Sequence, residues 1–306
     1  MTFLGIFLFL TVPIGLIAGY QHYKIRKQPA YDSDNTVLNY ELLGTGKRRL
    51  ILLHGLTGSL NYWKRDLEKI TRSHQLLLVD FLGFGDSPKP KSEYSLAVQL
   101  NALEKIIVQE GFNDGETVVA GHSMGAIVSL ALLAKQPNWF KAGVFIGMPV
   151  YKDVNEFKTV MSTHSFVDRI STSKFSKYIC MIHPIFMSNA FKPDNLTDDV
   201  YEDAKKHHWM SYYYSLTEVI LKTDLYSLAH DIKDKEVLFI HGRKDTTAPI
   251  ENAIKLSEVF TNAKVVTSIK GDHQFFLKEP NFVWQSIQNL GITKKNIQKT
   301  LSNGHN

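Results

Sequence analysis

The chain has 306 residues, which is long enough for one large α/β domain or two modest ones. Its formal charge of +5 is mild, and no basic helix is interleaved with aromatic residues, so nucleic acid is a poor candidate partner. The single cysteine, Cys180, rules out an intrachain disulfide and is typical of a reducing compartment. We expect Cys180 to be a small buried apolar residue.

The N-terminal segment has the character of a membrane helix. No charged side chain occurs before Lys24, and residues 2–20 are almost wholly apolar. A helix of this length rises roughly 1.5 Å per residue and covers a hydrocarbon core of about 30 Å. Lys24, Arg26 and Lys27 follow the apolar run, which favours a cytosolic C-terminal side. The sequence therefore predicts a single-pass membrane anchor over residues 1–27, with the rest of the chain in the cytosol.

A cleaved signal peptide and a buried core helix are the two alternatives to the anchor. A cleaved signal peptide needs a positive n-region and a small-x-small cleavage site, and the positive n-region is missing. A buried core helix is disfavoured because the segment is apolar on every face and precedes the expected folded domain. The uncleaved anchor is the favoured interpretation.

Strands and helices alternate over residues 28–150 and again over residues 223–292. This alternation predicts an α/β fold with a mostly parallel central sheet and helices on both faces. Residues 293–306 are expected to form a polar, basic tail. The expected strands are 36–43, 49–53, 75–79, 117–121, 142–146, 236–240 and 263–269, and the expected helices are 96–109, 124–135, 225–232, 250–260 and 280–290.

The alternation stops over residues 151–222, where no strand–turn–helix unit is legible. We interpret this stretch as a helical lid, inserted as a cap over the C-terminal edge of the sheet. Tyr212, Tyr213 and Tyr214 cannot all face one side of a helix, so at least one is expected to line a pocket or the seam between lid and core. The expected helical pieces are 157–161, 166–170, 175–187 and 201–221, all rich in aromatic residues and Met.

The pentapeptide Gly121-His122-Ser123-Met124-Gly125 lies between an expected strand and an expected helix. A strand that turns straight into a helix leaves its corner residue strained, with the side chain projecting outward. Residues two before and two after the corner crowd together, which requires glycine at both positions. The pattern therefore predicts a nucleophile at Ser123, and an ordinary turn with a serine N-cap is the alternative.

Two further strand ends carry the groups that a serine nucleophile needs. A serine alcohol attacks poorly until a base takes its proton. In open α/β sheets, catalytic groups collect on the loops after the carboxyl ends of strands. Asp245 follows the expected strand 236–240, and His273 follows the expected strand 263–269. The order Ser123, Asp245, His273 is the one expected of a catalytic triad in this architecture.

Two other carboxylates lie close to these positions in the sequence. Asp272 adjoins His273, but immediate neighbours on a loop rarely face each other, so Asp245 is the favoured acid. Asp86 lies in a glycine-rich loop, where we expect turn chemistry with Ser87 as a cap.

The remaining histidines give no sign of a metal site. His54 and His122 flank the proposed nucleophile, and we expect both to be structural or to line the pocket. His183, His207 and His208 lack metal-ligand spacing and a nearby acidic cluster, so no metal is predicted. The glycine-rich loop lacks the spacing of a dinucleotide fingerprint, so no nucleotide cofactor is predicted either.

Five motifs occur at expected strand ends. They are His54-Gly55, Asp80 to Ser87, Gly121 to Gly125, His241 to Asp245 and Gly271 to His273. With these motifs the chain resembles the α/β-hydrolase fold family over residues 36–290. Leu82 is a departure, because many relatives carry proline before the glycine of that loop. Little sheet is legible before Thr36, so the usual first edge strand is expected to be short or absent.

The resemblance implies a role for each matching position. Ser123 would attack the substrate carbonyl, while His273 accepts its proton and later delivers it to the leaving group. Asp245 would hold the tautomer of His273 and stabilise the imidazolium. The oxyanion hole would consist of the backbone N–H groups of Leu56 and Met124.

The resemblance also implies acyl chemistry. Serine at the elbow excludes the haloalkane dehalogenase and epoxide hydrolase branches, which share this fold but carry aspartate there. The aromatic and Met content of the lid indicates an apolar acyl pocket. We therefore expect a serine hydrolase that cleaves lipid-like carboxylic esters, such as monoacylglycerols or medium and long acyl esters, without a cofactor. The alternatives are carbon–carbon bond hydrolysis, acyl transfer, and a non-catalytic binding member of the fold.

Overall fold

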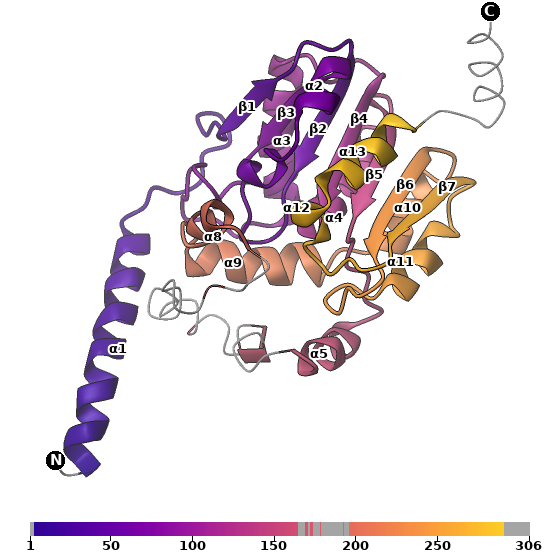
Figure 1. Cartoon of the computed structure of the whole chain (residues 1–306). Helices are drawn as coiled ribbons and strands as arrows, with labels where there is room; N and C mark the ends of the chain where they lie inside the picture. Colours follow the sequence, from indigo (N-terminus) through magenta and orange to yellow (C-terminus); the bar gives the residue numbers. More distant parts are fainter. Residues whose placement is uncertain are drawn as a thin grey trace, which may run out of the picture.

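The central sheet has seven strands in the order β1-β3-β2-β4-β5-β6-β7 (Figure 1). The computed structural model describes residues 3–164, 169–170, 172–173, 178, 192 and 196–290, the first eleven of them as backbone only. Among the described strands, only β1 runs antiparallel to its neighbour, β3. The strands are β1 (Tyr40–Leu43), β2 (Arg48–Leu53), β3 (His74–Val79), β4 (Thr117–His122), β5 (Phe140–Ile146), β6 (Glu236–Gly242) and β7 (Asn262–Ser268).

The strand order has its switch point between β2 and β4. From β2 the chain first adds β3 on one side, and β4 then begins the other side of the sheet. In open α/β sheets a crevice forms at such a point, outside the carboxyl ends of the strands. β2 ends directly before His54-Gly55 and β4 ends directly before Ser123. Two of the five motifs therefore meet at this crevice.

Helices cover both faces of the sheet (Figure 1). Side chains of one set of helices join one apolar cluster, and those of a second set join another. The first set is α3 (Leu96–Gln109), α4 (Met124–Lys135), α10 (Leu225–Asp231) and α11 (Ile250–Ser257). The second set is the 3-10 helix η1 (Leu60–Trp63), α2 (Glu68–Ser73), α12 (Phe275–Lys278) and α13 (Pro280–Gln288).

The residues of β2 illustrate why its sequence is apolar without interruption. Ile51 and Leu53 belong to the first cluster, whereas Leu50 and Leu52 belong to the second. All four side chains are completely buried. Successive side chains of a strand point to opposite faces, so a strand covered on both faces needs apolar residues at every position.

The predicted α/β-hydrolase fold, with its mostly parallel sheet and helices on both faces, is confirmed. The first strand is shorter than predicted: it covers Tyr40–Leu43, whereas the sequence suggested 36–43. Directly before this strand, the carbonyl oxygen of Asn39 accepts the backbone N–H of Asp80 at 2.9 Å, while the other polar groups of Asn39 bond to side chains. Its backbone N–H donates to Ser87 Oγ at 2.8 Å, and its Nδ2 donates to Asp80 Oδ2 at 2.7 Å.

Between β5 and β6 the described elements are all helical. They are α5 (Val154–Ser162), α8 (Asp198–Ala204), α9 (Trp209–Tyr214), the π-helix η3 (Ser215–Ile220) and α10. Of the three successive tyrosines, Tyr212 lines a cavity beside Ser123, and Tyr213 and Tyr214 pack near Trp209. The predicted helical piece 175–187 apart from residue 178, most of 166–170, Cys180, His183 and the tail 293–306 lie outside the described residues.

The N-terminal segment forms the helix α1 (Phe3–Arg26), but the predicted membrane anchor is wrong. Among the residues that the structure describes, no helix is both long and apolar enough to cross a membrane. This finding contradicts the anchor over residues 1–27, the membrane as a partner, and the membrane localisation with a cytosolic domain. The prediction counted apolar residues in a row. In the described C-terminal part of α1, polar Gln21, His22 and Lys24 follow that run, and Ile25 is buried against Trp209 of α9.

Candidate active site

Ser123 lies at the corner between β4 and α4 in a conformation that serine rarely adopts. Its φ is 53° and its ψ is −119°. A Cβ atom at Gly121 would lie 2.1 Å from the carbonyl oxygen of Gly125, and one at Gly125 would lie 2.3 Å from that of Leu53. Glycine is therefore required at both positions, and the corner residue carries strain of about 1–3 kcal/mol. This turn presents the Ser123 hydroxyl to the cavity at the sheet edge.

The loops after β6 and β7 bring Asp245 and His273 to Ser123. His273 Nε2 lies 3.0 Å from Ser123 Oγ, and His273 Nδ1 lies 2.8 Å from Asp245 Oδ2. All three residues are buried. When Nδ1–H donates to the carboxylate, Nε2 carries the lone pair that faces the Ser123 hydroxyl. The arrangement can remove the proton from a serine that attacks a carbonyl carbon.

Asp245 is held as a carboxylate by its surroundings. Its Oδ1 accepts the backbone N–H groups of Thr247 at 2.9 Å and Ala248 at 2.8 Å, and its Oδ2 also lies 3.4 Å from His241 Nε2. Burial acts to raise the pKa of Asp245, but the charge of His273 and the hydrogen bonds from His241, His273 and Ala248 outweigh it. The pKa of this carboxyl therefore lies well below its usual range.

His122, the residue before the nucleophile, forms a hydrogen bond to the backbone of His273. Its Nε2 donates to the backbone carbonyl oxygen of His273 at 2.8 Å, and its ring packs 4.4 Å from the ring of Phe276. Burial, followed by the charge of His273, holds the pKa of His122 well below its usual range. The sequence predicted a structural or pocket-lining residue here, but the contact with His273 depends on the fold and had no sequence signal.

The lowered pKa of His122 predicts that the protein loses stability as the pH falls. A histidine in the unfolded chain has a pKa of about 6.5, so below that pH the unfolded state binds a proton that the folded state does not bind. The stabilising contribution is complete above about pH 6.5 and declines by up to about 1.4 kcal/mol per pH unit below it. Thermal melts between about pH 7.5 and pH 5 should show a smaller decrease in Tm for His122→Gln than for the wild type. An equal decrease in both proteins would contradict this assignment.

His54 shapes the turn that precedes the proposed oxyanion donor Leu56. Its Nδ1–H donates to the carbonyl oxygen of Gly55 at 2.7 Å, and its Nε2 accepts the backbone N–H of Phe81 at 3.0 Å. Both ring nitrogens are therefore occupied by backbone groups. Leu56 lines the cavity beside Ser123, and Met124 is the first residue of α4.

The other carboxylates and histidines that the sequence offered as candidates have partners outside the triad. Asp272 Oδ1 accepts the backbone N–H of Gln274 at 2.9 Å, and Asp86 pairs with Lys206 at 2.8 Å. His207 Nδ1 lies 2.5 Å from the carbonyl oxygen of Ala204, next to the end of α8. Within the described parts of the chain, no group of three or more His, Cys, Asp or Glu side chains could hold a metal ion.

A cavity of about 210 Å³ opens beside Ser123, between the sheet edge and the helices of the insertion. One wall is apolar and comes from α5 and η3, where Phe157, Met161 and Leu216 form a buried cluster. Ser123 and His273 line the same cavity. A cavity that holds both an apolar surface and a nucleophile suits a substrate with a hydrocarbon part next to the bond that is attacked.

Comparison with known proteins places this chain among the α/β hydrolases. A family model described as the alpha/beta hydrolase fold matches residues 48–280. The chain therefore belongs to the α/β-hydrolase fold family. The chain is 24% identical over 280 residues to the probable lysophospholipase BODYGUARD 1 of Arabidopsis thaliana, with 78% of this chain and 59% of that protein covered. It thus spans less than two thirds of that relative's length.

Solved structures agree on the fold. A bromoperoxidase from Bacillus anthracis superposes with a TM-score of 0.67 at 18% identity, covering 86% of this chain and 98% of that one. An esterase from Exiguobacterium antarcticum superposes with a TM-score of 0.66 at 17% identity, covering 84% of this chain and 96% of that one. At this level of identity the likeness establishes the architecture and leaves the reaction to the side chains at the sheet edge.

Proposed function

We propose that this protein is a serine hydrolase that cleaves carboxylic esters with a Ser123–His273–Asp245 triad. The observation that carries the proposal is the continuous hydrogen-bonded line from Ser123 Oγ through both nitrogens of His273 to Asp245, at 3.0 and 2.8 Å, beside a cavity. A serine in a strained corner, a histidine with its lone pair toward it and an ionised acid are the three parts of acyl-transfer catalysis.

In the proposed reaction, Ser123 Oγ attacks the ester carbonyl carbon as its proton passes to His273 Nε2. The carbonyl oxygen becomes an oxyanion, which the backbone N–H groups of Leu56 and Met124 stabilise. His273 then protonates the alcohol as the carbon–oxygen bond breaks, and an acyl-enzyme remains. A water molecule, deprotonated by the same nitrogen, attacks the acyl-enzyme and releases the acid.

We propose further that the preferred substrates are lipid-like, with medium or long acyl chains. The apolar wall of Phe157, Met161 and Leu216 supports this substrate class, because a hydrocarbon chain gains from burial there. In this proposal residues 151–222 act as a lid between the two parts of the core, 28–150 and 223–292. The relative described as a probable lysophospholipase is consistent with such substrates.

The substrate class is tested by filling the cavity from its apolar wall. Met161→Trp adds bulk where the acyl chain would lie, so kcat/KM for 4-nitrophenyl decanoate should decrease about tenfold or more, because each methylene that an apolar pocket no longer accepts costs about 1–3 kcal/mol of transition-state binding. Activity on 4-nitrophenyl acetate should change less than about threefold. The matched control is Val154→Trp, which places the same ring at an exposed position of the same helix. An equal loss on both esters, or a wild-type optimum at acetate, would contradict the lipid-like substrate.

A further inference from the structure

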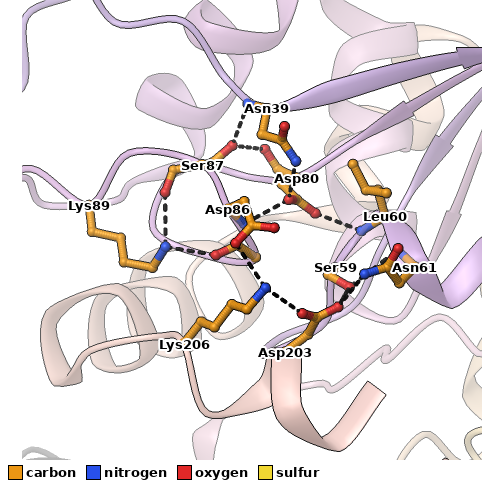
Figure 2. A network of polar contacts seen from close by, with 11 residues as sticks. Asn39, Ser59, Leu60, Asn61, Asp80, Asp86, Ser87, Lys89, Asp203 and Lys206 are labelled. Carbon is orange, nitrogen blue, oxygen red and sulfur yellow. Dashed lines mark hydrogen bonds and ion pairs between the residues drawn. The ribbon is translucent and has the colours of Figure 1, made fainter. Parts of the chain in front are cut away.

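A buried carboxylate outside the proposed triad bonds to the loop that carries the proposed oxyanion donor. Asp203 lies in the last turn of α8, in the insertion between β5 and β6, and exposes only 5% of its surface. Its Oδ2 accepts Ser59 Oγ–H at 2.5 Å and Asn61 Nδ2–H at 2.6 Å (Figure 2). Ser59 and Asn61 come from the core, more than 140 residues earlier in the chain.

A second carboxylate, on the side of the sheet, bonds to Leu60, the residue between Ser59 and Asn61. Asp80, directly after β3, accepts the backbone N–H of Leu60 at 2.6 Å through Oδ1. Its Oδ2 accepts Asn39 Nδ2–H at 2.7 Å and the backbone N–H of Asp86 at 2.8 Å. Figure 2 shows Asp80 and Asp203 on either side of the segment from Ser59 to Asn61. This segment is therefore fixed between the sheet and the insertion.

The segment from Ser59 to Asn61 directly follows the turn that carries the proposed oxyanion donor, the Leu56 N–H. Residues Gly55 to Gly58 form a turn closed by the Gly58 N–H and the Gly55 carbonyl oxygen at 3.0 Å, and Leu56 lies within it. Thr57 has a φ of 61°, which a threonine adopts only where its surroundings impose it. Ser59 follows this turn immediately, so a shift of Ser59 is transmitted to the direction of the Leu56 N–H.

Asp203 is also kept ionised, which makes it a pure acceptor. Lys206 lies 2.7 Å from its Oδ1 and 2.8 Å from Asp86, so the lysine joins α8 to the glycine-rich loop as well. Burial acts to raise the pKa of Asp203, but the hydrogen bonds from Lys206, Ser59 and Asn61 outweigh it and hold the pKa below its usual range. An ionised carboxylate accepts shorter and stronger bonds than a neutral group does.

We propose that Asp203 is a positioning residue for the oxyanion hole: through Ser59 and Asn61 it sets the turn that carries the Leu56 N–H. The inference rests on the proposed ester hydrolysis. In consequence, α8 is a fixed part of the catalytic apparatus although it belongs to the helical insertion, and the insertion contributes to transition-state stabilisation as well as to the acyl pocket.

The alternative is that the contact of Asp203 with Ser59 and Asn61 only anchors α8 to the core. The chain offers a matched control for that function, because a second ion pair anchors the same helix without touching the loop. Asp199, in the first turn of α8, lies 2.7 Å from Arg65 Nη2. Asp199→Ala therefore removes an anchor of α8 and leaves Ser59 and Asn61 with their acceptor.

The experiment compares wild type, Asp203→Ala, Asp203→Asn, Ser59→Ala and Asp199→Ala. For each folded protein it measures kcat and KM on 4-nitrophenyl octanoate and the inhibition constant of an alkyl trifluoromethyl ketone. That ketone forms a tetrahedral adduct with a catalytic serine, and its oxyanion occupies the hole. Thermal melts record stability separately, and Ser123→Ala serves as the inactive reference.

We expect Asp203→Ala to lower kcat by about 10–100-fold, with KM changed less than about threefold. The loss in kcat should be smaller than the roughly 10²–10³-fold that removal of an oxyanion donor typically costs, because the Leu56 N–H is misdirected and still present. Inhibition by the ketone should weaken by a similar factor. Asp203→Asn should recover much of kcat, because its Oδ1 can still accept from Ser59 and Asn61. Combining Asp203→Ala with Ser59→Ala should add little to either single change, and Asp199→Ala should leave kcat near the wild-type value.

Three results would overturn the inference while the wild type remains an esterase. The first is a kcat and ketone affinity of Asp203→Ala within about threefold of the wild type. The second is an equal loss in Asp199→Ala, and the third is a loss confined to KM. If Asp203→Ala does not fold, Ser59→Ala decides by the same criteria. A wild type that hydrolyses no ester would refute the proposed function and this inference with it.

Discussion

Ser123→Ala is expected to lower kcat for ester hydrolysis by about 10⁵–10⁶-fold while the protein remains folded. The substitution removes the oxygen that His273 Nε2 faces at 3.0 Å and leaves the Cβ that the backbone at φ 53° already accommodates. Residual catalysis from the oxyanion hole and from binding alone would remain. The measurement is kcat on 4-nitrophenyl octanoate, together with a thermal melt of each protein.

A serine within the helix that follows Ser123 provides the control for this change. Ser129 is completely buried in α4, and its Oγ has no hydrogen-bond partner among the described residues. Ser129→Ala should therefore keep kcat within about twofold of the wild type. A Ser123→Ala protein that retained more than about one per cent of wild-type kcat would contradict the nucleophile assignment.

Asp245→Asn is expected to lower kcat by about 10³–10⁴-fold, because the hydrogen bonds around residue 245 would impose the wrong tautomer on His273. The N–H groups of Thr247 and Ala248 require an acceptor at Oδ1, so the asparagine keeps its oxygen there. Its NH₂ group then faces His273 Nδ1 and donates to it. This fixes the proton of the imidazole on Nε2, toward Ser123, and the histidine cannot accept the proton of the serine. The measurement is kcat on the same ester, at constant pH.

Asp272→Asn is the control, because Asp272 adjoins His273 in the sequence and is the competing acid. Its Oδ1 accepts the backbone N–H of Gln274 at 2.9 Å, a bond that the asparagine oxygen can preserve. The variant should keep kcat within about threefold of the wild type. If Asp272→Asn lost as much activity as Asp245→Asn, the assignment of the acid to Asp245 would be wrong.

The sequence predicted those features that depend on neighbouring residues or on the general rules of parallel sheets. The glycines at 121 and 125 are required by atoms a few residues away or by the neighbouring strand β2, so the corner at Ser123 could be recognised from five residues. The parallel sheet followed from strands that are buried on both faces, such as β2. Because such strands end at one edge, it was reasonable to expect Asp245 and His273 near Ser123.

The parts that the sequence did not predict depend on contacts between distant segments. Asp203 touches Ser59 and Asn61 across more than 140 residues, and no periodicity or motif marks that pair. His122 supports His273 through a backbone carbonyl, which any residue at 273 would offer. The short elements η1, α2 and α12 have only four to six residues, too few for a helical period to be recognised.

The N-terminal segment gave an incorrect prediction because apolar content alone does not say what covers a helix. Residues 2–20 suggested lipid as the cover. No described helix meets the length and apolarity that a membrane span needs, and the buried contact of α1 lies beyond that run, where Ile25 packs against Trp209 of α9. The contact partner lies more than 180 residues away, beyond the reach of any local pattern.

The central claim, that Ser123 forms an acyl-enzyme with help from His273, is tested most directly by locating a trapped covalent adduct. The full chain is treated with an alkyl fluorophosphonate, and the modified peptide is identified by mass spectrometry, with Ser123→Ala treated in parallel. The account predicts a single adduct on Ser123 in the wild type and none in the variant. A folded wild type that remains unmodified, or that carries the adduct on another residue, would contradict it.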